Sequence, residues 1–221
     1  MRFSFDTLRS RCLDEWQAYC QHEFVRGLGS GNLPEAAFRH YLKQDYLFLL
    51  HFARAFALAA YKSRDLSDLR RGAEGLKAIL DVELDLHIAY CREWGISEAQ
   101  LATLPEARAT MAYTRYVLDA GSRGDLLDLH VALAPCMLGY AEIATWLEAQ
   151  PFTRTDGNPY AAWIAMYAGE EFRQAARAEQ DWLDARLAGI DERRFEELVT
   201  IFSEATRLEA DFWQMGLDLA D

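Results

Sequence analysis

Apolar residues recur every three or four positions along most of the chain, which is the spacing of one face of an α-helix. Strict alternation of apolar and polar residues between hairpin turn signals, the pattern of a strand, does not stand out anywhere. The sequence therefore predicts an all-α protein without a sheet. We expect helices over residues 4–22, 34–62, 65–94, 105–121, 125–149, 160–168, 169–188 and 191–219.

Proline and glycine residues support these boundaries. Pro34 and Pro105 suit the first turn of a helix, where the missing N–H of proline costs no hydrogen bond. Gly95 suits a C-terminal cap after Trp94. Residues 153–159, TRTDGNP, have the composition of a surface loop.

Composition and charge restrict the class of protein. The chain has 51% hydrophobic and 26% charged residues, and no Pro-, Gly- and Ser-rich linker divides it, so we expect one domain over residues 1–221. Its net charge of −12, with Lys and Arg spread out, argues against nucleic acid or an anionic membrane as a partner. Charges near the N-terminus exclude an apolar signal segment, and polar and helix-breaking residues interrupt the apolar passage at 131–147. We therefore expect a cytoplasmic protein.

Two acidic residues interrupt apolar helix faces. Asp45 lies between Leu42 and Leu49 on the stripe of one predicted helix, and Glu209 precedes Phe212 on the stripe of the last. Asp and Glu are rarely buried unless paired, because desolvating the charge is costly. Each acid is either a structural one hydrogen-bonded to Tyr, Trp or Arg, or part of a binding site.

A cysteine lies beside a proline within the most apolar predicted helix, 125–149. Pro135 removes one backbone donor and is expected to kink the helix next to Cys136. Gly139 and Tyr140 follow three and four positions later, on the face of Cys136. A thiol, a gap and a phenol would then line one cavity, although a lone cysteine in an apolar helix is more often simple packing.

Metal and haem chemistry find little support. The four cysteines are scattered without a CxxC pair, which fits reduced thiols better than disulfides or a zinc site. No Glu-x-x-His pair of a di-iron bundle is present. Glu83 and His87 lie four positions apart and form either a metal-ligand pair or, more simply, a helix-face contact. His22 is the candidate for an axial haem ligand.

Four segments, taken together and in order, resemble the TenA/thiaminase II family in its cysteine-containing branch. The segments are HYLKQDYLFLLHFARAFALAAYKS, LAPCMLGYAEI, NPYAAWIAMYAGEEF and RLEADFWQMG. The resemblance implies a haem-oxygenase-like helical bundle without haem, metal or cofactor, assembled as a homotetramer. It also implies hydrolysis of 4-amino-5-aminomethyl-2-methylpyrimidine to the hydroxymethylpyrimidine of thiamin salvage, with slower cleavage of thiamin.

The resemblance also assigns roles to residues. Cys136 matches the nucleophile, Glu209 the acid/base, and Asp45 the carboxylate that binds the exocyclic amine and ring nitrogen of the pyrimidine. The residues that match the aromatic and phenolic wall of the pocket are Phe48, Tyr113, Tyr140, Tyr167 and Phe212. Tyr116, one turn from Tyr113, is the alternative for that position.

These residue types suit a covalent mechanism. A thiolate can add to an electron-poor pyrimidine carbon while Glu209 protonates a ring nitrogen. Two other classes of function stay open from the sequence: a non-catalytic or regulatory protein that binds thiamin-like ligands, and a metal- or haem-dependent oxygenase on the same bundle.

Overall fold

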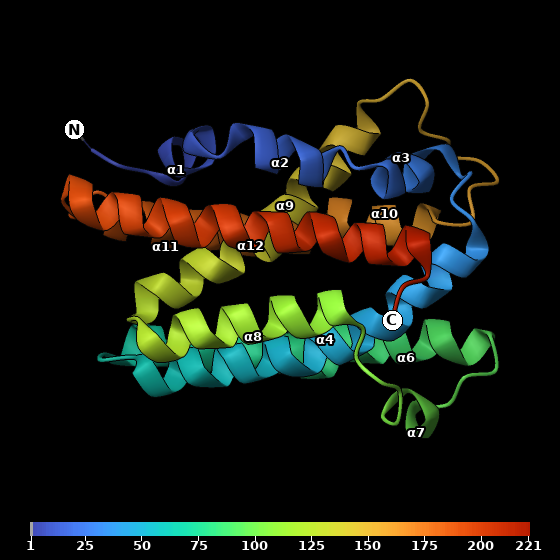
Figure 1. The fold of residues 1–221 in the computed structure, drawn as a ribbon, viewed down its shortest axis with the longest axis horizontal. Coiled ribbons are helices and arrows are strands. Elements are labelled where there is room, and N and C mark those ends of the chain that lie inside the picture. Colours follow the sequence, from blue (N-terminus) through green and yellow to red (C-terminus); the bar gives the residue numbers. More distant parts are fainter. Residues whose placement is uncertain (1) are drawn as a thin grey trace. The chain divides into compact units, whose positions relative to one another are not determined.

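Every regular element within residues 2–221 is helical. The computed structural model describes residues 2–221, and Figure 1 shows its helices, with no strand in that range. The prediction of an all-α protein is therefore confirmed. The chain forms two compact units: the Cys136 unit contains the chain up to Pro34 and Val131–Gln214, and the Asp45 unit contains Glu35–His130 and Met215–Asp221.

The helices divide between these units. The Cys136 unit holds α1 (Phe5–Arg11), α2 (Leu13–Cys20), α3 (Glu23–Ser30), α10 (Ala161–Ala168), α11 (Glu170–Leu187) and most of α9 (Leu126–Glu148) and α12 (Glu192–Asp218). The Asp45 unit holds α4 (Glu35–Lys62), α5 (Leu66–Ala78), the π-helical turn η1 (Ile79–Glu83), α6 (Leu84–Glu93), α7 (Glu98–Leu101) and α8 (Arg108–Arg123).

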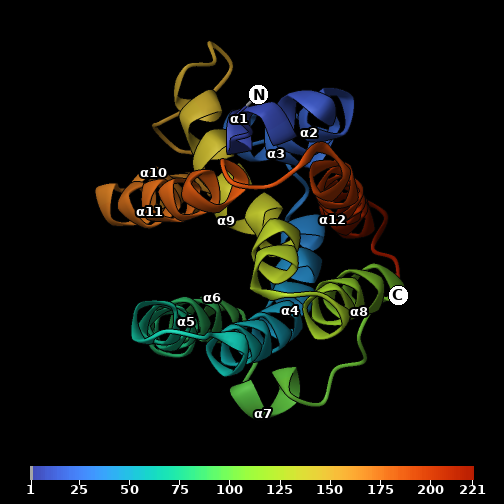
Figure 2. The same cartoon turned by 90° about the vertical axis from the view of Figure 1, so that its left-hand side faces the viewer.

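The long helix α4 is the centre of the Asp45 unit, and α5, α6 and α8 pack on it (Figure 2). Its predicted apolar stripe is buried throughout, including Asp45. Helix α5 approaches α4 closely at Gly72, where a Cβ atom would lie 2.6 Å from the backbone nitrogen of Ala60. The two helix backbones can therefore be this close only because Gly72 has no side chain.

Stacked aromatic rings and a hydrogen-bonded loop stabilise the Cys136 unit. Trp16 stacks on Phe202, with 5.5 Å between ring centroids. The loop that begins at residue 153 is held by Asn158, whose Nδ2 donates to the carbonyl oxygens of Leu28 and Gly29. These carbonyls lie in the last turn of α3, where a helix leaves carbonyl groups without partners of its own, so the contact satisfies the helix end and holds the loop.

Several predicted boundaries are wrong for local reasons. The segment 4–22 is two helices, because the chain bends at Cys12, which ends α1 and precedes α2. The segment 65–94 is interrupted by η1, and α3 and α7 were not expected. Pro105 lies before α8 rather than in its first turn. The cap at Gly95 is confirmed, with φ +74° and its N–H donating to the carbonyl of Arg92.

Helix α9 differs from the expectation that the apolar passage at 131–147 is too short and too interrupted to span a membrane. It is long and apolar enough to cross a membrane by length and composition, although the sequence suggested that this passage falls short. However, 72% of its most apolar window is buried inside the protein, as in the core helix of a globular fold. One such helix is weak evidence of a membrane span.

The contact at Gly72 makes a stability prediction. Gly72→Ala places a Cβ against the α4 backbone, which cannot yield as a flexible side chain would. We expect the free energy of unfolding, measured by urea denaturation, to fall by about 1–3 kcal/mol after the better helix propensity of Ala is included. Gly189→Ala, whose Cβ would meet nothing nearer than 3.9 Å, is the control. A Gly72→Ala variant as stable as this control would contradict the packing.

Candidate functional site

The residues assigned to the site fall into two groups, one in each unit. Asp45, Phe48 and Tyr113 belong to the Asp45 unit. The Cys136 unit contains Cys136, Tyr140, Tyr167, Glu209 and Phe212. Each group has its own geometry.

Asp45 is buried and paired with a histidine. Its side chain projects from α4 and is 6% exposed, and its Oδ2 lies 2.5 Å from Nε2 of His87 on α6. The hydroxyl of Tyr41, one turn earlier on α4, donates to the same oxygen over 3.2 Å. The other ring nitrogen of His87, Nδ1, lies 2.8 Å from the backbone carbonyl oxygen of Glu83. The carboxylate thus has the partners that burial requires.

His87 is the residue of this group that the sequence did not single out for Asp45. The sequence offered Glu83 and His87 as a metal-ligand pair or a helix-face contact, and the structure shows the contact: Nδ1 of His87 binds the backbone of Glu83, while Nε2 faces Asp45. Within residues 2–221, no group of three or more His, Cys, Asp or Glu is arranged to hold a metal ion. His22, the candidate haem ligand, instead caps α3 by accepting from the N–H of Phe24.

Burial and charge act in opposite directions on this group. Burial alone would lower the pKa of His87, but the Asp45 charge and hydrogen bond, together with Glu83, raise it above its ordinary value. Burial raises the pKa of Glu83 to about 7; the charge of His87 opposes this and that of Asp45 adds to it. A π-helical turn ends at Glu83, and such turns are frequent at functional sites.

Phe48 and Tyr113 lie against each other. Their rings stack with 5.0 Å between centroids and 26° between planes, one from α4 and the other from α8. Tyr113 is 1% exposed, whereas Tyr116 is half-buried. Tyr113 thus stacks on Phe48 inside the Asp45 unit.

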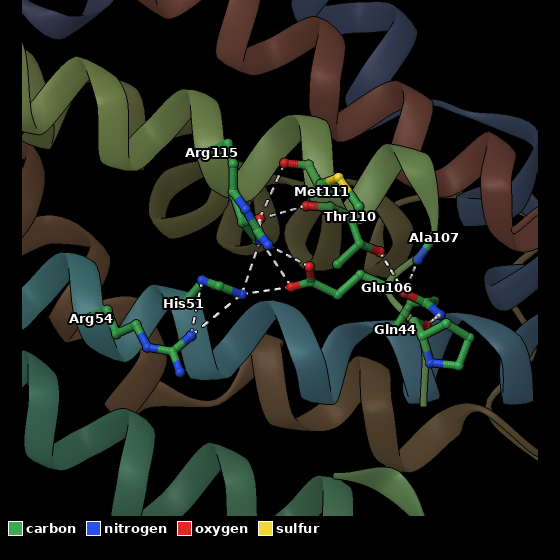
Figure 3. Close-up of polar contacts among 10 residues, drawn as sticks. Gln44, His51, Arg54, Glu106, Ala107, Thr110, Met111 and Arg115 are labelled. Atoms are coloured by element: carbon green, nitrogen blue, oxygen red, sulfur yellow. Dashed lines mark hydrogen bonds and ion pairs between the residues drawn. The ribbon is translucent and has the colours of Figure 1, made fainter. Parts of the chain in front are cut away.

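Gln44, the neighbour of Asp45, fixes where α8 begins (Figure 3). Its Nε2 donates to the carbonyl of Pro105, and its Oε1 accepts from the N–H of Ala107 and the hydroxyl of Thr110. Ala107 has no side chain that could cap α8, so the cap comes from α4. This link sets the position of α8, and with it Tyr113, relative to Asp45.

A second charged cluster joins α8 to α4 further along (Figure 3). Oε1 of Glu106 lies 2.6 Å from Nε2 of His51, and both oxygens of Glu106 bind the guanidinium of Arg115. The hydrogen bond from Arg115 is the main cause that lowers the pKa of Glu106. Arg54 also donates to His51. The cluster strengthens the same helix pair at a partly exposed position.

The cavity expected beside Cys136 is partly filled. Cys136 is half-buried, but Tyr19 occupies the space left by Gly139, where a Cβ would lie 2.3 Å from a ring carbon. The hydroxyl of Tyr19 donates to the carbonyl of Pro135 over 3.2 Å. The expected gap at Gly139 is therefore a packing contact, and the helix continues through Pro135.

Aromatic rings surround the remaining residues of the Cys136 unit. The centroid of Tyr140 lies 4.8 Å from that of Tyr167, 5.7 Å from Trp163 and 5.5 Å from Trp213. Trp163 is 1% exposed, and its indole N–H has no hydrogen-bond partner among the described residues. The sequence pattern did not single out Trp163 or Trp213, because aromatic residues at helical spacing carry no mark of function.

Glu209 and Phe212 lie on α12 and are each 2% exposed. The predicted burial of this acid is confirmed. Its charge contributes, after burial itself and Glu142, to a pKa of Cys20 well above the ordinary value. Glu209 therefore lies near Cys20 of α2, inside the same unit as Cys136.

The contacts of Gln44 predict a large effect for a single substitution. Gln44→Leu leaves the buried N–H of Ala107 and the buried hydroxyl of Thr110 without this partner, and also the carbonyl of Pro105. We expect the free energy of unfolding to fall by about 2–4 kcal/mol in urea denaturation, and Thr110→Val, which removes one of the contacts, to cost about 1 kcal/mol. Equal losses for both variants would show that Gln44 does not hold α8.

Glu83 predicts a pH dependence of stability. Its pKa is raised from 4.5 to about 7, so the folded chain holds a proton that the unfolded chain releases between these values. This stabilisation is complete below pH 4.5 and is lost as the pH rises through 7. Raising the pH from 5 to 8 should therefore lower the free energy of unfolding of the wild type by about 1–2 kcal/mol more than that of Glu83→Gln, as measured in urea titrations. Asp81→Asn, at an exposed position of the same turn, is the control and should show no such gain.

Comparison with known proteins gives the family. Residues 9–219 match the model of the TENA/THI-4/PQQC family. The chain is 40% identical to a protein of Halalkalibacterium halodurans named aminopyrimidine aminohydrolase, over 91% of this chain and 89% of that protein.

Solved structures agree with this match. A crystal structure from Silicibacter sp. TM1040, described as a TenA family transcription regulator, is 42% identical, with a TM-score of 0.90 over 98% of this chain and 97% of that chain. A domain of unknown function from Shewanella denitrificans, described as having a heme oxygenase-like fold, is 14% identical, with a TM-score of 0.73 over 98% and 93% of the two chains. The second likeness concerns the fold alone. The fold is haem-oxygenase-like, and the chain belongs to the TENA/THI-4/PQQC family.

Proposed function

We propose that this protein hydrolyses 4-amino-5-aminomethyl-2-methylpyrimidine to 4-amino-5-hydroxymethyl-2-methylpyrimidine and ammonia, and that it cleaves thiamin more slowly. The observation that carries the proposal is the likeness, along nearly the whole chain, to a protein named aminopyrimidine aminohydrolase. The geometry agrees with such a substrate, since a buried, paired carboxylate and stacked aromatic rings are what a small flat heterocycle requires.

Cys136 is the proposed nucleophile. Its thiolate adds to a ring carbon of the pyrimidine while Glu209 gives a proton to a ring nitrogen, which stabilises the adduct. The electrons of the ring then expel ammonia from the protonated aminomethyl group, or the thiazole of thiamin, from the 5-methylene carbon. Water adds to this carbon and releases a proton. The ring nitrogen returns its proton to Glu209 as the thiolate departs, which restores the aromatic ring and the free enzyme.

The other assigned residues bind and orient the ring. Asp45 binds the exocyclic amine and a ring nitrogen, because a carboxylate in a low-dielectric setting makes strong hydrogen bonds. The proposed wall of the pocket consists of Phe48, Tyr113, Tyr140, Tyr167 and Phe212. Two of its contacts support this assignment, the stack of Phe48 on Tyr113 and the close approach of Tyr140 to Tyr167.

We further propose that the chain is one domain over residues 1–221, that it forms a homotetramer, and that it acts in the cytoplasm. The family match from residue 9 to 219 runs through both compact units and supports one domain. Several large apolar side chains of the Asp45 unit are exposed, which supports self-association. They are Tyr61, Leu66, Leu69, Leu80, Val82 and Met111.

A ligand-binding role without chemistry is the second candidate. The related structure from Silicibacter sp. TM1040 is described as a transcription regulator, and this observation favours a role as a regulator that binds thiamin-like compounds. The two candidates differ in one result: a regulator binds a pyrimidine and releases no product.

The thiol mechanism predicts the behaviour of Cys136→Ser. We expect hydroxymethylpyrimidine formation, measured by mass spectrometry, to fall by at least about 100-fold, since a serine hydroxyl is a far weaker nucleophile at neutral pH. Binding of the product should persist. Cys12→Ser is the matched control, because Cys12 is a buried thiol of the same unit whose pKa burial raises to about 11. Turnover of Cys136→Ser equal to that of Cys12→Ser would refute the covalent scheme.

A further inference from the structure

The Asp45–His87 pair holds a proton whose position can be argued from its neighbours. A carbonyl oxygen can only accept a hydrogen bond, so Nδ1 of His87 carries a proton and donates it to the backbone of Glu83. Nε2 of His87 and Oδ2 of Asp45 are 2.5 Å apart, which requires one more proton between them. The pair is therefore neutral as a whole and contains one proton that can move.

A 4-aminopyrimidine can bind a carboxylate through both its amine and its adjacent ring nitrogen only if such a proton is available. Its exocyclic amine is a donor, but the adjacent ring nitrogen is an acceptor. An ionised carboxylate is also only an acceptor. Its oxygen lone pair would therefore face the lone pair of this ring nitrogen, and the two would repel each other. A carboxylate binds both groups well only when a proton is supplied to the ring nitrogen or to the carboxyl group.

We propose that His87 is a positioning residue for Asp45 that orients its carboxylate and stores the proton that the ring nitrogen of the aminopyrimidine receives on binding. This inference rests on the proposed function. The proton moves from the His87–Asp45 pair to the ring nitrogen, which leaves a pyrimidinium bound to the Asp45 carboxylate and a neutral His87. Nε2 of His87 is then an acceptor that faces the acceptor Oδ2, so these two atoms must move apart while the ligand is bound. Nδ1 of His87 keeps its proton on the Glu83 carbonyl, and the stored proton returns when the product leaves.

The surroundings of His87 fit this role. His87 and Tyr41 both bind Oδ2 of Asp45, which directs the ligand to Oδ1. The groups that face the pair are Tyr41 from α4, Glu83 from η1 and Cys91 from α6. His87 is 1% exposed, so the pair has little contact with bulk water. Burial alone would lower the pKa of His87, but the Asp45 charge and hydrogen bond raise it above its ordinary value, which favours the protonated pair.

The chain offers a matched control. His51 also pairs through Nε2 with a carboxylate, Glu106, over 2.6 Å, and it lies on α4 in the same unit as Asp45. His51→Gln and His87→Gln therefore make the same chemical change in two His–carboxylate pairs. Only the pair of His87 includes a residue assigned to the substrate.

The test is the dissociation constant of 4-amino-5-hydroxymethyl-2-methylpyrimidine by calorimetry from pH 6 to pH 8, with turnover measured in parallel. For the wild type and His51→Gln we expect the dissociation constant to change less than about threefold across this pH range, because the His87–Asp45 pair supplies the proton. His87→Gln retains a donor to Asp45 but holds no transferable proton. Its dissociation constant should therefore rise about tenfold per pH unit, since one proton must come from solution with each ligand.

The outcomes separate the two proposals. If His87→Gln binds more weakly than the wild type by the same factor at every pH, His87 is merely structural and the inference is wrong. An unchanged constant, or the same change in His51→Gln, overturns it as well. If the wild type neither binds nor converts the pyrimidine, the proposed function fails.

A measurement on the wild type covers the case in which His87→Gln does not fold. NMR that correlates the imidazole nitrogens with their protons should show, at pH 7, a strongly deshielded proton that is bound to Nε2 of His87 and shared with Oδ2 of Asp45. Its absence would overturn the inference.

Discussion

A carboxylate taken out of water must be paired, and this constraint on Asp45 links the parts of its unit. The side chain lies on the buried face of α4, so its partners have to come from the protein. Tyr41 supplies one hydrogen bond from the same helix, and His87 supplies the other from α6. The backbone of Glu83 in turn orients His87. One buried charge thus ties α4, the π-helical turn and α6 together.

The neighbouring position extends this arrangement to α8. Gln44 caps α8 with a side chain from α4, and the stack of Phe48 on Tyr113 follows from the same placement. Residues 44, 45 and 48 of α4 therefore carry a helix cap, an acid and an aromatic ring. The proposed binding of a flat heterocycle uses the last two, and the first holds them in place.

The sequence predicts the helical fold and the burial of the two acids because both depend on the spacing of residues within one helix. The stripes through Asp45 and Glu209 were read correctly for this reason. The partners of these acids come from other helices, and spacing within one helix carries no information on them. The spacing pairs His87 with Glu83, four positions earlier, but carries no sign that Nε2 of His87 binds Asp45.

The errors have the same origin. Gly139 suggested an open space, but whether a ring from another helix fills it is a tertiary property, and Tyr19 does so. The bend at Cys12 and the π-helical turn lie within apolar patterns that continue through them, so periodicity alone did not reveal them. The family resemblance found residues such as Tyr113 that no local pattern distinguishes from ordinary core.

The central claim is that this protein replaces an amine by a hydroxyl group from water. The most direct measurement is to incubate it with 4-amino-5-aminomethyl-2-methylpyrimidine in water enriched in oxygen-18 and to analyse the products by mass spectrometry. The account predicts hydroxymethylpyrimidine with one labelled oxygen and one ammonia released per product molecule. Binding of the pyrimidine without labelled product or ammonia would contradict the claim and leave a binding protein in its place.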